Sequence, residues 1–181
     1  MEQPVHAIEV SFDTQADVVV RAAWEALDET GVTSGQRGGD DYRPHLSLSV
    51  FARGNLEVVA ESVRRALASH PLPTLRLSHV GAFLAPRQVL FCGVTPTVEL
   101  MICQQAVDAA IREGGGTPWP IYSPRTWVPH CTLAMDVAGD IDQLRILTSI
   151  GLPLDAEPNR TRLVEVPSGL VVADLTEGSE S

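Results

Sequence analysis

Two histidines stand in the same short pattern at two places in this sequence. The first pattern is Pro44-His45-Leu46-Ser47-Leu48, and the second is Pro129-His130-Cys131-Thr132-Leu133. Imidazole titrates near neutral pH, so a pair of histidines can serve as general base and general acid. A hydroxyl two residues after each histidine can donate a hydrogen bond to a phosphate oxygen. Two such segments facing each other would be suited to cleaving a phosphodiester.

Both patterns alternate polar with apolar residues, which predicts β-strands. Successive side chains of a strand point to opposite faces. We therefore expect His45, Ser47 and Ser49 to share one face of the first strand, and His130 and Thr132 to share one face of the second. The apolar residues between them should anchor each strand in a core.

The rest of the chain must position these two strands. Periodicity and capping residues predict helices over residues 16–30, 55–69, 98–113 and 141–150. Further strands are predicted over residues 5–12, 75–84, 88–94, 162–166 and 170–175, with a hairpin turn at 85–87. Because hairpin-like pairs recur, we expect an α+β protein with mixed or mainly antiparallel sheets rather than a doubly wound parallel sheet. Residues 1–176 should form a single two-lobed domain, and residues 177–181 a flexible C-terminal tail.

Charge limits the classes of function. The 181 residues include 23 acidic and 13 basic residues, every basic one is an arginine, and the formal net charge is −10. Without lysine, a P-loop or Schiff-base mechanism is excluded. The negative charge disfavours long nucleic acid and anionic membranes as partners, but it permits a small phosphate-bearing ligand held by a few arginines.

Cysteine usage and the N-terminal residues favour a cytoplasmic protein. Cys92, Cys103 and Cys131 lie in apolar surroundings and form no CxxC motif, so we expect buried free thiols rather than disulfides. The first arginine is Arg21, and no basic start followed by an apolar stretch suggests a signal peptide.

The paired motifs, His45-Leu46-Ser47-Leu48 and His130-Cys131-Thr132-Leu133, resemble the signature of the two-histidine (2H) phosphoesterase superfamily. That group includes 2′-5′ RNA ligase-like proteins and 2′,3′-cyclic phosphodiesterases. The order of predicted elements from Val5 to Leu175 is also similar to the family. The resemblance implies a bilobal fold in which two mainly antiparallel sheets, related by pseudo-twofold symmetry, flank a central cleft and carry one motif each.

The resemblance also implies a mechanism that needs no metal and no cofactor. One histidine would activate water against the 2′,3′-cyclic phosphate of a nucleotide or short RNA end, and the other would protonate the leaving ribose oxygen. By resemblance, His130 is expected to be the base and His45 the acid. Ser47 and Thr132 would hold the phosphate. Ligation of 2′-5′ RNA would be the reverse reaction, with a 5′-hydroxyl replacing water.

Three more residues are candidates for substrate contacts. Arg43 and Arg125 lie near the two motifs, and a guanidinium can bind phosphate with its planar fork. Tyr122 lies in the loop before the second motif, where an aromatic ring could stack on a nucleobase. The expected partner is a small nucleotide or short RNA end, with no long duplex nucleic acid and no membrane, and we expect a monomer.

The sequence leaves two other functions open. The same cleft could belong to a non-catalytic module that binds nucleotide or phosphate. It could also belong to a metal-dependent hydrolase, although neither motif strand brings a third carboxylate or thiolate to the face of its histidine, so no metal site is predicted.

Overall fold

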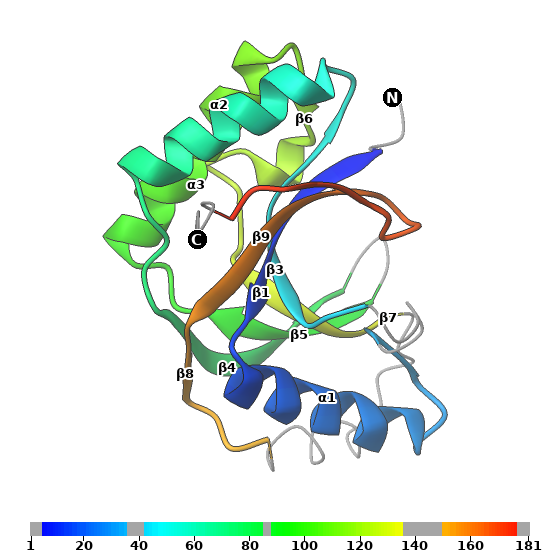
Figure 1. Ribbon diagram of the computed structural model, residues 1–181. Coiled ribbons are helices and arrows are strands. Elements are labelled where there is room, and N and C mark those ends of the chain that lie inside the picture. The colour runs from blue at the N-terminus through cyan, green and yellow to red at the C-terminus, as the bar shows by residue number, and fades with distance from the viewer. Residues whose placement is uncertain (1–4, 36–41, 85–87, 136–149, 177–181) are drawn as a thin grey trace.

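The computed structural model describes residues 5–35, 42–84, 88–135 and 150–176 (Figure 1). In chain order its elements are β1 (His6–Phe12), α1 (Thr14–Asp28), β2 (Thr33–Ser34), β3 (His45–Ala52), α2 (Leu56–Ser69), β4 (Leu75–Phe83), β5 (Val89–Val94), α3 (Val98–Glu113), β6 (Thr117–Pro118), the 3₁₀ turn η2 (Pro120–Tyr122), β7 (His130–Met135), β8 (Leu154–Ala156), β9 (Pro158–Glu165) and β10 (Val171–Asp174). The turn predicted at 85–87, the tail 177–181 and all but the last residue of the helix predicted over 141–150 lie outside the described residues.

The strands form two antiparallel sheets whose strand orders match. One sheet has the order β10-β9-β1-β3-β6, and the other has the order β8-β4-β5-β7-β2. Strand β1 therefore corresponds to β5, β3 to β7, and β9 to β4. Each motif strand lies beside the central strand of its own sheet. The predicted α+β fold with two pseudo-symmetric antiparallel sheets is confirmed.

The helices are exchanged between the two sheets. Helix α1 follows β1 of the first sheet, yet it packs against β2 and β7 of the second (Figure 1). Helix α3 follows β5 of the second sheet, yet it packs against β3 and β6 of the first, and α2 packs on α3. The two sheets are thus covered by helices that the chain reaches only by crossing between them.

Each of the three α-helices begins at a side-chain cap. The carboxylate of Asp13 accepts from the backbone N–H groups of residues 15 and 16, and the amide oxygen of Asn55 accepts from residues 57 and 58. The hydroxyl of Thr97 accepts from the N–H of residue 100. These caps satisfy donors that the first helical turn leaves unpaired, and they explain why the helices start where they do.

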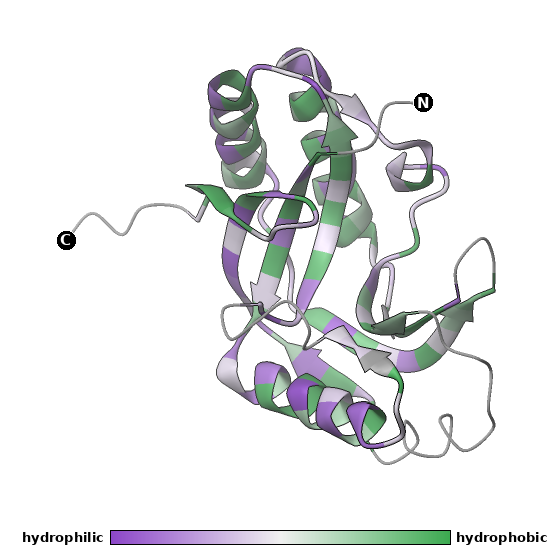
Figure 2. Ribbon diagram, turned by 90° about the vertical axis from the view of Figure 1, so that its right-hand side faces the viewer, coloured by the Kyte–Doolittle hydropathy of each residue, from purple (hydrophilic) through white to green (hydrophobic). Residues whose placement is uncertain are grey.

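Apolar side chains from both sheets and all three helices meet in one large core, of which Trp24, Phe12 and Phe51 are among the largest fully buried members. Coloured by hydropathy, the helices and strands carry hydrophobic residues interleaved with hydrophilic ones (Figure 2). The three cysteines are buried and free, as predicted. Strand β9 begins at Pro158, four residues before the predicted start, and the two-residue strands β2 and β6 and the short strand β8 were not predicted.

Candidate active site

The first motif strand contains a β-bulge directly after its hydroxyl residue. Glu9 of β1 pairs with Ser47, but the preceding Ile8 pairs with Ser49, so Leu48 is an extra residue on β3. A bulge breaks the alternation of side chains between the two faces. Ser49 consequently aligns with Ile8 and is fully buried. The prediction that Ser49 shares the face of the motif histidine is therefore wrong.

The second motif strand contains a bulge at the equivalent point. Phe91 of β5 pairs with Thr132, but the preceding Leu90 pairs with Ala134, so Leu133 is the extra residue on β7. Both motifs therefore have the same backbone irregularity at their fourth position. The pseudo-twofold relation extends from strand order down to single residues.

A tryptophan indole binds the backbone of each motif. Nε1 of Trp127 donates to the carbonyl oxygen of Ser47, and Nε1 of Trp24 donates to the carbonyl oxygen of Thr132, both at 3.1 Å. Both indoles are buried. Since buried carbonyl groups need a hydrogen-bond partner, the indoles stabilise the backbone at Ser47 and Thr132, the hydroxyl residues of the two motifs.

The two histidines have matching backbone hydrogen bonds. Nδ1 of His45 lies 2.8 Å from the carbonyl oxygen of Arg43, and Nδ1 of His130 lies 2.7 Å from the carbonyl oxygen of Val128. A carbonyl oxygen can only accept, so Nδ1 carries the proton in both rings. In each histidine Nε2 is the atom left to exchange a proton with a substrate.

His45 has a carboxylate beside that second nitrogen. Oε1 of Glu9 lies 3.3 Å from Nε2 of His45, and both side chains are largely buried. The ring of Tyr42 meets His45 edge-on, with ring centroids 5.3 Å apart. Both nitrogens of His45 thus face oxygen atoms that can accept a hydrogen bond. This environment suits His45 to donate a proton.

His130 has aromatic neighbours instead. Its ring centroid lies 5.0 Å from that of Phe83 and 5.3 Å from that of Phe91. Burial lowers the pKa of His130, the positive charge of nearby His45 lowers it further, and the hydrogen bond to Val128 opposes both effects. A lowered pKa keeps His130 neutral at pH 7, which suits it to accept a proton.

The difference between the two histidines arises at one pair of equivalent positions. Glu9 pairs with Ser47 across β1 and β3, just as Phe91 pairs with Thr132 across β5 and β7. A symmetric backbone therefore carries a carboxylate beside one motif and a phenyl ring beside the other. This is how two similar imidazoles come to have unlike environments.

Two cavities border the motifs. One, of about 820 Å³ and called the polar cavity below, contains His45 and the charged residues Glu9, Arg43, Arg160 and Arg162, together with apolar residues such as Leu170 and Val171. The other, of about 570 Å³, contains His130 and Thr132 and is mainly apolar; its other members include Phe83, Trp119, Tyr122 and Trp127.

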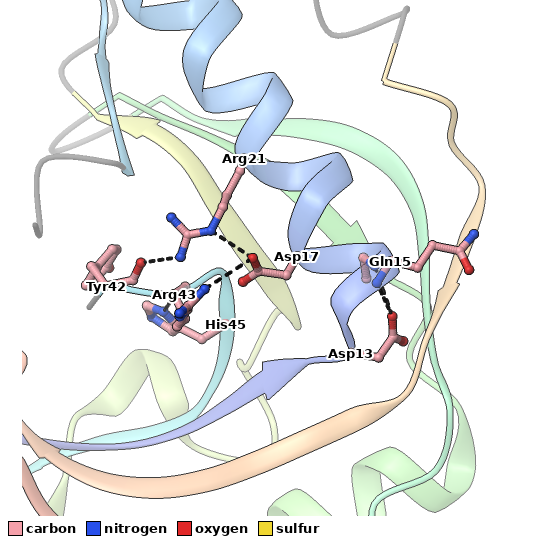
Figure 3. Close-up of polar contacts among 8 residues, drawn as sticks. Asp13, Gln15, Asp17, Arg21, Tyr42, Arg43 and His45 are labelled. Atoms are coloured by element: carbon pink, nitrogen blue, oxygen red, sulfur yellow. Dashed lines mark hydrogen bonds and ion pairs between the residues drawn. The ribbon is translucent and has the colours of Figure 1, made fainter. Parts of the chain in front are cut away.

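Arg43 lines the polar cavity, and its side chain lies near Asp17 of α1 (Figure 3). Its guanidinium lies 3.6 Å from the carboxylate of Asp17. Arg21 binds the same carboxylate more closely, at 2.8 Å, and also donates to the carbonyl oxygen of Tyr42. Helix α1 thus holds the segment that leads into His45, while the side chain of Arg43 stays 54% exposed.

Of the two remaining candidates, Tyr122 lies at the site and Arg125 does not. Tyr122 lines the apolar cavity, and burial together with the charge of Glu9 raises its pKa to about 12, against the opposing effect of a hydrogen bond with the Ser47 side chain. Its phenol is therefore neutral beside the first motif. Arg125 is exposed in the segment between η2 and β7 and lines neither cavity.

Several residues of the site were missed by sequence reasoning. Glu9 and Phe91 were read only as members of strands, although alternation along 5–12 already placed Glu9 opposite the core residues. What the sequence could not supply was the pairing of β1 with β3 and of β5 with β7. Arg160 was missed because the strand was predicted to begin at residue 162, and Arg162 was missed because the pairing of β9 with β1 was not known.

Comparisons with known proteins agree with this geometry. A family described as the "2'-5' RNA ligase superfamily" matches residues 19–165, which is more than half of the chain. The crystal structure of the MHV ns2 PDE domain shares 15% identity with a TM-score of 0.55, covering 91% of this chain and 99% of its own. A crystal structure of a phosphoesterase shares 14% identity with a TM-score of 0.57, covering 96% and 97%. These two show the same fold. No curated protein sequence matches the chain.

Two further features concern the described residues alone. None of the helices there has both the length and the apolar character needed to cross a membrane. In the same residues, no three His, Cys, Asp or Glu side chains gather as a set that would hold a metal ion.

Proposed function

The chain belongs to the 2′-5′ RNA ligase superfamily, and from this premise we propose that it hydrolyses 2′,3′-cyclic phosphates of nucleotides or short RNA ends. His130 is the general base and His45 the general acid. Ser47 and Thr132 hold the phosphate through their hydroxyls. The same site can run the reverse reaction, 2′-5′ RNA ligation, when a 5′-hydroxyl replaces water.

One observation carries this assignment of roles: the unlike neighbours of two histidines on equivalent strands. His45 has the Glu9 carboxylate 3.3 Å from Nε2, whereas His130 lies against two phenyl rings and has a lowered pKa. Acid and base need opposite protonation states at the same pH. The Glu9 carboxylate gives Nε2 of His45 a hydrogen-bond acceptor, which suits the role of donor, and the lowered pKa of His130 favours its neutral form.

In each turnover His130 accepts one proton and His45 donates one. Nε2 of His130 removes a proton from water, and the water oxygen attacks phosphorus. The bond between phosphorus and one ribose oxygen breaks, and that oxygen takes the proton from Nε2 of His45. The product is a phosphomonoester beside a free ribose hydroxyl, and proton exchange with solvent restores both imidazoles. Hydroxyl donors at Ser47 and Thr132 stabilise the charge on the phosphoryl oxygens.

The apolar cavity is a suitable place for the nucleobase. It adjoins His130 and Thr132, and Phe83, Trp119 and Tyr122 are among its members. Bases stack on aromatic side chains with little dependence on sequence. The two solved structures of this fold are a PDE domain and a phosphoesterase, which supports phosphoester chemistry for this chain as well. A net charge of −10 favours a nucleotide or short RNA end over a long RNA.

The proposal is tested by hydrolysis of adenosine 2′,3′-cyclic phosphate in the presence of EDTA. Wild type should turn over, and His45→Ala and His130→Ala should each lower kcat by about 100-fold or more. His70→Ala is the matched control, because His70 is an exposed residue at the end of α2 and should have no effect.

Three outcomes would contradict the proposal. Full activity in both motif variants would exclude paired-histidine catalysis. Binding of the cyclic nucleotide without turnover would instead support a non-catalytic binding module. Loss of wild-type activity in EDTA, restored by a divalent metal, would indicate a metal-dependent hydrolase.

A further inference from the structure

Strand β9 brings two arginines to the polar cavity that the two-histidine chemistry does not use. Arg160 and Arg162 line this cavity together with His45 and Arg43. Arg162 pairs with Glu9 across β9 and β1, so it lies on the same face of the sheet as the motif residues of β3. Figure 1 shows β9, β1 and β3 as neighbours. The arginines are therefore part of the wall beside His45.

Among the described residues, the equivalent wall beside His130 carries no arginine. In the second sheet, β4 corresponds to β9, and Gly81 pairs with Phe91 where Arg162 pairs with Glu9. One wall of the site is thus polar and rich in arginine, and the other is aromatic. A nucleotide has the same division, since its base is apolar and aromatic and its phosphates are anionic.

The acidic side chains near this wall leave its arginines able to bind a phosphate. Among the described residues, Arg43 and Arg160 have long ion pairs, at 3.6 Å to Asp17 and 3.8 Å to Asp174, and their side chains are 54% and 57% exposed. Asp174 also lies across the sheet from Arg162, and its side chain is 46% exposed. Exposed pairs of this kind contribute little and can be displaced by a phosphate. The carboxylate of Glu9 lies against His45. Glu165, the other acidic group of the cavity, pairs across the sheet with His6.

We propose that Arg160 and Arg162, with Arg43, bind a second phosphate of the substrate, the 5′-phosphate of the nucleotide whose cyclic phosphate lies between His45 and His130. This rests on the function proposed above. Strands β3 and β9 are separated only by β1, which corresponds to about 10 Å at the usual strand spacing. A nucleotide can span this distance with the help of a long arginine side chain. The substrate class is thus a 5′-phosphorylated nucleotide or an RNA end, in which a phosphate occupies the same position.

The test compares two substrates that differ by one phosphate. Adenosine 2′,3′-cyclic phosphate and its 5′-phosphorylated form are hydrolysed by wild type, by Arg160→Gln/Arg162→Gln and by Arg65→Gln/Arg76→Gln. The control pair removes two exposed arginines, on α2 and β4, and so changes the net charge equally. In wild type the 5′-phosphate should lower KM about tenfold, which corresponds to one charge-assisted contact.

The double variant on β9 should lose most of that gain and retain wild-type kcat/KM for the unphosphorylated compound, which also shows that it is folded. The control pair should keep the gain, and rising salt should reduce it. Equal KM values for both substrates in wild type would overturn the second-phosphate site, as would a gain that survives in the β9 variant or disappears equally in the control. Either result leaves cyclic-phosphate hydrolysis standing. Hydrolysis of neither compound by wild type would overturn the proposed function and this site with it.

Discussion

The indole hydrogen bonds to the motif backbones can be removed with small changes, Trp24→Phe and Trp127→Phe. Each substitution leaves a carbonyl oxygen, of Thr132 or of Ser47, without its donor at 3.1 Å. A buried polar group that loses its partner costs roughly 1–3 kcal/mol. Replacing a buried indole with a phenyl ring adds a small cavity, at a cost of about 1 kcal/mol. We therefore expect each variant to lose about 3 kcal/mol of unfolding free energy.

Urea unfolding measures this loss. With a slope of about 2 kcal/mol per molar, the midpoint should fall by about 1.5 M for each variant. Because the indoles position the backbone of the phosphate-binding hydroxyl residues, kcat should fall more than KM rises. Trp119→Phe is the control for stability, since Trp119 is 38% exposed and no carbonyl depends on its indole among the hydrogen bonds of the described residues.

The pseudo-symmetry of the two motifs also predicts how the stability losses of the two tryptophan variants compare. Because the two indoles donate equivalent hydrogen bonds to the motif backbones, their variants should lose similar amounts of stability. A midpoint unchanged from wild type in either variant would refute the view that the indoles stabilise the motif backbones. Normal kcat in a clearly destabilised variant would separate this structural role from positioning of the site.

Three other expectations can be measured. By NMR titration, the pKa of His130 should lie below its ordinary value of 6.5, and it should rise in His45→Gln, which removes a positive neighbour. Because His130 must be neutral to act as the base, kcat/KM should fall only as the pH drops below 6.5. A fall in kcat/KM that begins above pH 6.5 would contradict this. Glu9→Gln should lower kcat about tenfold with little change in KM. Glu25→Gln, on the exposed face of α1, is the control and should behave as wild type. Equal rates in the two variants would show that Glu9 has no part in the mechanism. Burial raises the pKa of Cys103 to about 11 and of Cys92 to about 12. Iodoacetamide at pH 8 should therefore modify these thiols only after unfolding. Rapid labelling of the native protein would contradict this, because it would show that the thiols are accessible.

Local patterns predicted the parts of the site that depend on local chemistry. Alternation around His45 and His130 identified both motif strands, and Asn55 identified the start of α2. Ser49 was placed on the wrong face because the bulge at Leu48 has no sequence signal: bulges often use glycine, and here the extra residue is leucine.

The features that could not be predicted depend on which strands pair with one another. The contact between Glu9 and His45 joins two strands that are brought together only when the sheet forms, so no spacing along the chain announces it. Strand β9 was predicted too short because Pro158 looks like a strand breaker, but proline is tolerated at the first residue of a strand. Strand β6, which contains Pro118, was not predicted; it is an edge strand, where a missing N–H costs no ladder hydrogen bond.

The exchange of helices between the sheets has a mechanical consequence. Because α1 and α3 each leave one sheet to cover the other, neither half of the chain can be separated without uncovering an apolar face. The two walls of the site should therefore behave as one rigid block rather than as jaws on a hinge, and the protein should unfold in a single cooperative transition. Substrates must fit a gap of fixed width, so selection among them depends on the chemistry of the two walls and not on how far the protein closes around them.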